Sequence, residues 1–217
     1  GNEISTQVYF DSWNADLGHY EVTVITQLIG DMVTSNDTLK KEIGVFRGNY
    51  TVGNDLPIST YFGGAVGYSK IENELVEGYT FCFGGNTSSG NGTECYKYKV
   101  STDTWSNIAP LPEGRKLFAS AICDDYIYVI RETDINGVTQ TSVFKYNINS
   151  DVWTTVASLP LGLSWSKATV YNKRIYLAGG INSGNNVSRF VYVYDIEADQ
   201  WASANPLPQG RFGGAFS

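Results

Sequence analysis

The sequence predicts an all-β protein made of repeated four-stranded sheets, and three observations support this. Aromatic residues make up 14% of the 217 residues, beside 23 Gly and a single Met. Such a composition suits pleated, half-buried strands joined by tight turns, and it suits helix bundles poorly. The chain also repeats itself every 48 residues, and each repeat contains short apolar runs separated by turn residues.

The repeat is marked by a Tyr that is followed by a Trp seven positions later. Both residues recur 48 positions further along the chain, and a Leu-Pro pair recurs with the same spacing. Two independent marks in one register, three times over, indicate a structural repeat. The residues are Tyr98, Trp105 and Leu111-Pro112, then Tyr146, Trp153 and Leu159-Pro160, then Tyr194, Trp201 and Leu207-Pro208.

In the repeat that starts at Leu111, four strands are expected in order. Residues 117–123 form a first strand rich in small side chains, and residues 126–130 form an apolar second strand. The third and fourth strands span 142–146 and 152–156. One such sheet cannot bury both of its faces, so neighbouring sheets must stack. The turns contain Asp, Asn and Gly, which supply side-chain caps and positive φ angles, at Asp124-Asp125, Asn136-Gly137 and 147–151.

Paired glycines end the apolar strand in two of the repeats. They are Gly84-Gly85 and Gly179-Gly180, whereas the middle repeat has Arg131-Glu132. Together with the Tyr, the Trp and the Leu-Pro pair, this pattern resembles the kelch repeat from about Leu56 to Ser217. The resemblance implies a kelch-type β-propeller with four-stranded antiparallel blades, of which about four are visible. Small side chains would then line the axis, and the tryptophans would fill the wedges between blades.

The repeat divides the chain into five parts. Residues 56–110, 111–158 and 159–206 are expected to be kelch blades, and residues 1–55 a degenerate first blade in which Ile43 and Tyr50 keep the seven-residue offset. Residues 207–217 would begin a following blade or supply a closing strand. Because kelch propellers usually contain more blades, we expect this chain to be part of a larger propeller. The alternative is a four-bladed ring that residues 211–217 close.

Composition and charge exclude several function classes. A net charge of −7 and a pI near 4.7 argue against a nucleic-acid partner, which clustered Lys and Arg would bind. No stretch has the roughly 18 consecutive apolar residues of a membrane span. The single histidine, His19, cannot build a multi-imidazole copper site or a hydrolytic zinc site. We therefore expect no metal, no cofactor and no catalytic cluster.

Arg115 and Arg211 are the candidate binding residues. The resemblance places them at one mouth of the central channel, where arginines of peptide-binding kelch domains pair with acidic ligand groups. Thr60 and Leu163 occupy the same repeat position in the other blades. The alternative is that these arginines are tied to backbone or carboxylates within the fold.

The three cysteines and five sequons bear on compartment. Cys82 and Cys95 flank a hairpin centred near residue 88 or 89 and are a disulfide candidate, with two buried thiols as the alternative; Cys123 is expected to be a small apolar residue. Glycosylation and a disulfide would favour a secreted or luminal setting, with the cytoplasm as the alternative. The sequons lie at Asn36, Asn49, Asn86, Asn91 and Asn186.

Two functions from different classes follow. The first is a non-catalytic interaction or structural module, in which a rigid propeller presents loops to a protein or glycan partner, to copies of itself or to other chains of an assembly. The second is a kelch-propeller enzyme of the sialic-acid mutarotase or glycan-processing type, which needs a charged pocket at the channel mouth. The repeat and the scarcity of catalytic motifs favour the first.

Overall fold

The protein is described by a computed structural model that covers residues 18–25, 38–45, 53–72, 75–130, 140–182 and 184–213. The chain divides into two units, residues 1–52 and 53–217, and each is described by itself. In the first unit, β1 (Gly18–Ile25) pairs with β2 (Thr38–Val45) in an antiparallel hairpin. The interpretation of residues 1–55 as a degenerate blade stays a prediction.

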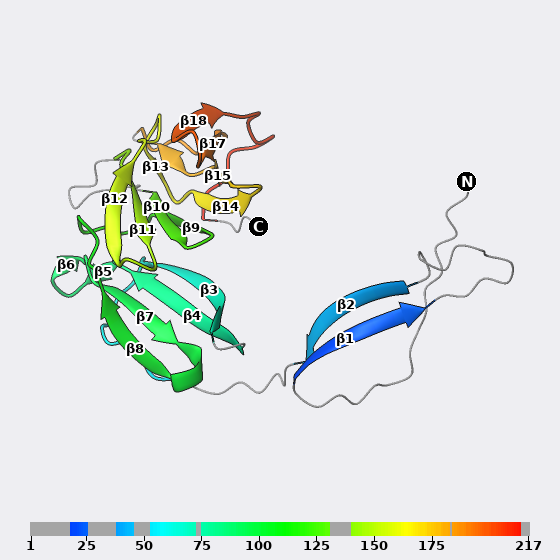
Figure 1. The fold of residues 1–217 in the computed structure, drawn as a ribbon. Helices are drawn as coiled ribbons and strands as arrows, with labels where there is room; N and C mark the ends of the chain where they lie inside the picture. The colour runs from blue at the N-terminus through cyan, green and yellow to red at the C-terminus, as the bar shows by residue number, and fades with distance from the viewer. Residues whose placement is uncertain are drawn as a thin grey trace, which may run out of the picture. The chain divides into compact units, whose positions relative to one another are not determined.

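The second unit contains three four-stranded antiparallel sheets, which confirms the predicted all-β fold. We call them blades 1, 2 and 3, and Figure 1 shows them fanned around their first strands. Blade 1 contains β3 (Gly64–Glu72), β4 (Leu75–Phe83), β7 (Cys95–Lys99) and β8 (Thr104–Ile108). Blade 2 contains β9 (Ala119–Cys123), β10 (Tyr126–Ile130), β11 (Val143–Asn147) and β12 (Val152–Val156). Blade 3 contains β14 (Lys167–Tyr171), β15 (Arg174–Ala178), β17 (Val191–Asp195) and β18 (Gln200–Ser203).

Short elements decorate the connections between these strands. Two small ladders lie beside the blades, and one turn of 3₁₀ helix, η2 (Val100–Thr102), precedes β8. The ladders pair β5 (Asn86–Thr87) with β6 (Gly90–Asn91), and β13 (Leu163–Ser164) with β16 (Ile181–Asn182).

The strands of blade 2 lie close to their predicted places. β10 and β12 have the predicted bounds, and β11 begins one residue later than expected. β9 begins at Ala119 rather than at residue 117, because Leu117 has a left-handed backbone with φ of 59° that cannot continue a strand. β9 lies next to both β3 and β14, so the small side chains of the first strands are where the blades come together.

The paired glycines let the end of a blade's second strand lie in close contact with the backbone of the next repeat. Gly179 and Gly180 have φ of 71° and 96°, and the Gly180 N–H donates a 2.7 Å hydrogen bond to the Arg211 oxygen. A Cβ on Gly179 would lie 2.3 Å from that oxygen, so no side chain fits there. Gly84, Gly85 and the Arg115 oxygen repeat this arrangement, with a bond of 2.8 Å from the Gly85 N–H.

The repeated tyrosines hold a turn aspartate by hydrogen bonding. The Tyr146 hydroxyl donates to Asp151 at 2.7 Å, and the same carboxylate oxygen accepts the Ala109 N–H from the end of blade 1 at 2.8 Å. Tyr146 is only 1% exposed, and burial followed by the Asp151 bond raises its pKa. Tyr98 with Asp103 and Tyr194 with Asp199 form the same bond at 2.6 Å.

Asn54 donates its backbone N–H to a turn aspartate, as Ala109 and Ala157 do at the boundaries between blades. Its N–H donates to Asp103 at 2.8 Å, as the Ala157 N–H donates to Asp199 at 2.8 Å. Ala109 and Ala157 each directly follow the last strand of a blade. Asn54 therefore makes the bond that is made, in blades 1 and 2, by the residue after the last strand.

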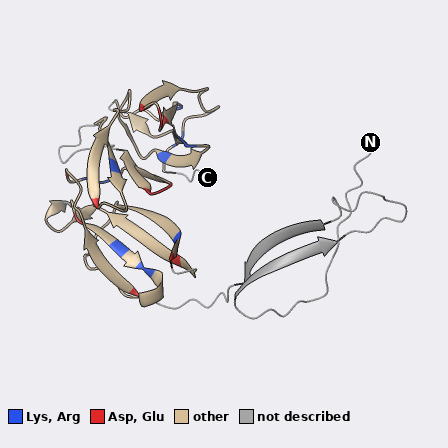
Figure 2. Ribbon diagram, in the orientation of Figure 1, with Lys and Arg blue, Asp and Glu red and all other residues tan. Residues whose placement is uncertain are grey.

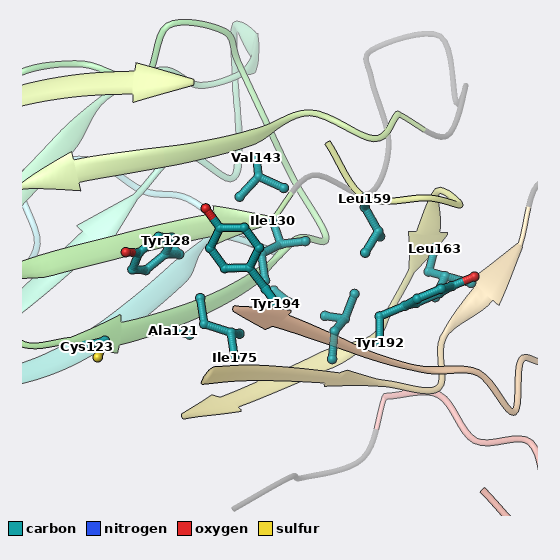
Figure 3. Packing of buried hydrophobic residues seen from close by; sticks show 12 residues of the cluster. Ala121, Cys123, Tyr128, Ile130, Val143, Leu159, Leu163, Ile175, Tyr192 and Tyr194 are labelled. Carbon is teal, nitrogen blue, oxygen red and sulfur yellow. The ribbon is translucent and has the colours of Figure 1, made fainter. Parts of the chain in front are cut away.

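Two apolar clusters fill the spaces between blades. One joins blades 1 and 2 and includes Phe81, Phe83 and Ile127. The other joins blades 2 and 3, where Tyr128 and Tyr194 meet edge to face at 5.9 Å between ring centroids (Figure 3). Stacked blades thus bury the faces that a single sheet would leave exposed.

The charged residues of the described sheets are interspersed in sign. Figure 2 shows acidic and basic positions scattered along the ribbon rather than gathered by sign. Within the described ranges, no helix has the length and apolar character needed to cross a membrane.

Candidate functional site

Arg115 lies inside blade 2. Its side chain is 0% exposed and its guanidinium stacks 3.4 Å from the centroid of the Phe144 ring. It donates hydrogen bonds to the Val129 oxygen at 3.2 Å and to the Ser142 hydroxyl at 3.1 Å. These contacts match the alternative interpretation, in which the arginine is tied within the fold.

Arg211 occupies the same repeat position and is exposed. Its main chain is fixed, because its N–H donates to the Ser188 oxygen at 3.2 Å and its oxygen accepts the Gly180 N–H. The side chain thus projects from an ordered backbone and is available to an anionic ligand group. The two predicted binding residues are not equivalent in the structure.

Both arginines belong to the end of the blades at which β3, β9 and β14 begin, which we call the entry end. It is built from residues 58–63, 112–118, 160–166 and 208–213. Each of these segments contains one residue with a left-handed backbone, six positions after the Leu of its Leu-Pro pair. The residues are Phe62, Leu117, Trp165 and Gly213, with φ of 60°, 59°, 59° and 66°.

Three aromatic side chains meet at the entry end. The Phe62 ring of blade 1 contacts the Trp165 ring of blade 3 edge to face, with 5.5 Å between centroids, and it contacts Tyr61 at 5.0 Å. Tyr61 is held in place by Asn86, whose backbone exchanges two hydrogen bonds with it and whose side-chain amide donates to the Tyr61 hydroxyl. Phe62 is 47% exposed and Trp165 is 36% exposed, so this aromatic cluster faces solvent.

A pocket of about 230 Å³ adjoins this cluster on blade 1. Tyr61, Phe62, Glu94 and Tyr96 are among the residues that line it. Burial raises the pKa of Tyr96, and the negative charge of Glu94 raises it further. An acidic residue and a tyrosine therefore line one pocket, together with the apolar residues Leu56, Ile58, Ala65, Cys82 and Phe83.

A shallow groove of about 500 Å³ lies at the opposite end, between β3 and the β9–β10 turn. Three of its polar side chains, Tyr68, Asp125 and Lys70, are bonded within the fold. The Tyr68 hydroxyl donates to Asp125, which raises the pKa of Tyr68 to about 12, and Asn149 donates to the other Asp125 oxygen at 2.9 Å. Lys70 pairs with Glu72 at 2.7 Å. These bonds already occupy the polar groups of Tyr68, Asp125 and Lys70.

The disulfide prediction is wrong. Both cysteines are free thiols, because the strand register places Cys95 opposite Phe83 and Cys82 opposite Tyr96. Successive side chains of a strand point to opposite faces, so Cys82 and Cys95 lie on different faces of blade 1. Burial raises the pKa of Cys95 to about 12. Cys123 is a buried free thiol, in line with its expected role as a small apolar residue.

The sequons fall in different settings. Asn186 is exposed and its amide donates to the Gly184 oxygen at 3.2 Å, and the Asn86 amide donates to the Tyr61 hydroxyl, so each would have to release a bond on glycosylation. Asn91 lies in β6, and Asn36 and Asn49 lie outside the described residues, as do Arg131-Glu132. Glycan occupancy and the secreted setting stay predictions. His19 lies in β1, and none of the described residues form a group of three or more possible metal ligands.

The sequence interpretation missed Phe62, Trp165, Glu94 and Tyr96. For the first two a signal existed. Aligning the repeats on their Leu-Pro pairs puts Phe62 and Trp165 in the column of Gly213, where a bulky residue is unexpected. Glu94 and Tyr96 carried no such signal, because the loop before β7 differs in length between repeats.

The three stacked four-stranded blades define a β-propeller. A family model described as Kelch motif matches residues 166–208. A solved structure, "Structure of YjhT", is similar with a TM-score of 0.58 and 23% sequence identity, over 75% of this chain and 56% of that one. The chain thus contains a kelch motif and has the fold of a kelch-type β-propeller. It spans 56% of the length of YjhT, and no curated protein matches it.

The expectation of a non-catalytic interaction module is wrong. The comparison with YjhT favours the second of the two expected functions over the first. At 23% identity the likeness itself shows the fold. Kelch repeats commonly mediate protein interactions, a property that an enzyme of this fold can share.

Proposed function

We propose that this chain is part of a kelch-propeller enzyme of the sialic-acid mutarotase or glycan-processing type, with its site in the Glu94 pocket. The observation that carries the proposal is that Glu94 and Tyr96, a tyrosine whose pKa is raised, line the same pocket. Interconversion of sugar anomers needs one group that accepts a proton and one that donates a proton. The likeness to YjhT supports the kelch-type propeller fold on which the proposal rests.

The chemistry balances without a co-reactant. The Glu94 carboxylate accepts the proton of the anomeric hydroxyl while the bond between the anomeric carbon and the ring oxygen breaks. The Tyr96 phenol gives its proton to that ring oxygen. After rotation of the open chain, ring closure runs the two proton transfers in reverse, and both side chains return to their starting states.

Arg211 is the cation that we assign to an acidic ligand group. It is exposed at the entry end, and Arg115 is not available for this role because it is buried. A guanidinium binds a carboxylate through two parallel hydrogen bonds, which orients the ligand as well as attracting it. We therefore expect Arg211→Ala to weaken binding of N-acetylneuraminic acid more than binding of a neutral sugar.

The test is anomer exchange followed by saturation transfer in ¹H NMR. The full 217-residue chain is mixed with N-acetylneuraminic acid and, separately, with glucose. We expect faster exchange of one of the sugars, and a loss of about 10²-fold or more of that acceleration in Glu94→Gln. Glu197→Gln, an exposed residue on the β17–β18 turn, is the matched control and should exchange anomers as the unmodified chain does. Exchange at the uncatalysed rate for both sugars would overturn the proposal.

A further inference from the structure

The four left-handed positions of the entry end are linked by backbone hydrogen bonds in two pairs. Gly213 donates its N–H to the Trp165 oxygen at 3.0 Å, and Leu117 donates its N–H to the Phe62 oxygen at 3.0 Å. These bonds link successive repeats along the rim. One of the four positions is the glycine Gly213, so the backbone itself requires no side chain at this position.

Phe62 and Trp165 hold a backbone conformation that bulky residues disfavour. A left-handed φ brings Cβ close to the following carbonyl oxygen, and glycine alone avoids this contact. Bulky residues keep such a backbone only where the surrounding structure over-determines it, and they cluster at active and ligand-binding sites. An aromatic ring could offset the strain by full burial, yet Phe62 stays 47% exposed and Trp165 stays 36% exposed.

We propose that Phe62 and Trp165 form a platform on which the pyranose ring of a sugar stacks. The inference rests on the proposed function and names the residues that position its ligand. The CH groups on one face of a pyranose form an apolar surface that matches an aromatic ring, while its hydroxyls need polar partners. The site supplies both, because Phe62 lines the pocket that also holds Tyr61, Glu94 and Tyr96.

The size and surroundings of the site fit a single sugar ring better than an apolar peptide. A peptide would need a longer apolar groove, whereas the pocket measures about 230 Å³ and is bordered by polar groups. The platform is also preorganised, since Tyr61 is fixed by Asn86 and packs on Phe62 at 5.0 Å. Little ordering is therefore needed when the ligand binds.

The experiment compares Phe62→Gly and Trp165→Gly with Leu117→Gly as the matched control. For each variant, binding of N-acetylneuraminic acid and of methyl β-glucoside is measured by calorimetry, and the melting temperature is recorded. We expect the two aromatic variants to bind at least about tenfold more weakly, the loss expected when a stacking ring is removed, with a melting temperature that is unchanged or higher. Leu117→Gly should keep both the affinity and the melting temperature, or raise the latter.

The outcomes separate a ligand platform from a packing role. A lower melting temperature in both aromatic variants would show that the rings stabilise the fold and would overturn the proposal, as would unchanged affinity. Phe62→Asn and Trp165→Asn are a second pair, because Asn tolerates the left-handed region, and they should lose affinity in the same way.

The inference and the proposed function can fail independently. Sugar binding that depends on the two rings, without any anomer exchange, would support the platform and contradict the proposed enzyme function. Anomer exchange that is unaffected by Phe62→Gly and Trp165→Gly would support the proposed enzyme function and contradict the platform.

Discussion

Trp153 in blade 2 donates a 2.8 Å hydrogen bond from its indole nitrogen to the main-chain oxygen of Ala109, at the end of blade 1. Trp201 makes the same bond to Ala157 at 2.9 Å, and Trp105 makes it to Asn54 at 2.9 Å. The tryptophans of blades 2 and 3 thus bind the residue that follows the last strand of the blade before each of them. This bond explains why Trp recurs with the repeat where another aromatic residue would fill the same space.

Replacement of Trp153 by Ala should lower the free energy of unfolding by about 3–5 kcal/mol, because it leaves a cavity between blades. The ring contacts Tyr146 at 4.9 Å and reaches Phe83 of blade 1 edge to face at 5.9 Å. Trp153→Phe keeps most of this packing and loses the bond to Ala109, so it should cost only about 1 kcal/mol. Urea denaturation measures both, and an unchanged midpoint in the alanine variant would contradict the wedge role.

Acid should weaken the blade junction at Asp199. The Tyr194 hydroxyl and then the Ala157 N–H hold the pKa of Asp199 below its ordinary value of 3.8. A folded-state pKa below the unfolded one adds stability that is present above the unfolded pKa and is lost as the pH falls through the folded pKa. The difference in free energy of unfolding between the unmodified chain and Asp199→Asn should therefore be constant above about pH 5 and shrink below about pH 4. A difference that stays constant down to pH 3 would contradict this account.

Truncation of Arg115 should lower the free energy of unfolding, whereas truncation of Arg211 should leave it nearly unchanged. Arg115→Ala removes a fully buried side chain and its bonds to Val129 and Ser142, so the free energy of unfolding should fall by about 3 kcal/mol or more. Arg211→Ala changes an exposed side chain and should stay within about 0.5 kcal/mol. Thermal melts of both variants measure this, and equal losses would show that the repeat position has one structural role throughout.

The three cysteines should be reduced, and burial should slow their reaction with a thiol reagent in the folded protein. In denaturant without a reductant, all three cysteines should react with a thiol reagent, because Cys82 and Cys95 do not share a face of blade 1. In the folded protein Cys95 should react slowest, since burial raises its pKa to about 12 and leaves little thiolate. Recovery of a single thiol in denaturant would show a Cys82–Cys95 bond and contradict the strand register.

Much of the fold could be predicted from the sequence because the spacing of the recurring residues shows where each strand of a repeat lies. The spacing of Tyr146, Trp153 and Leu159 located the strands of blade 2 within two residues, and the glycine pairs marked the ends of β4 and β15. Local spacing was enough here because each blade pairs its strands in chain order. Only the long β3–β4 hairpin, with nine residues in each strand, departs from the pattern of the other blades.

The site was less predictable because it depends on register and backbone angle, which spacing alone does not give. A shift of one residue in the pairing of β4 with β7 separates Cys82 from Cys95. Whether an arginine is buried like Arg115 or exposed like Arg211 depends on neighbours such as Phe144, which are distant in sequence. Phe62 and Trp165 meet across two repeats, a contact that no local pattern reports.

Binding of the sugar at the entry end is tested most directly by the amide chemical shifts of the ¹⁵N-labelled chain. During titration with N-acetylneuraminic acid or glucose, we expect the amides of Tyr61, Phe62, Gly84 and Glu94 to shift together with one dissociation constant. The amides of Ser69, Lys70 and Asp125 in the groove at the opposite end should not move. Shifts confined to that groove, or no shifts with either sugar, would contradict the account.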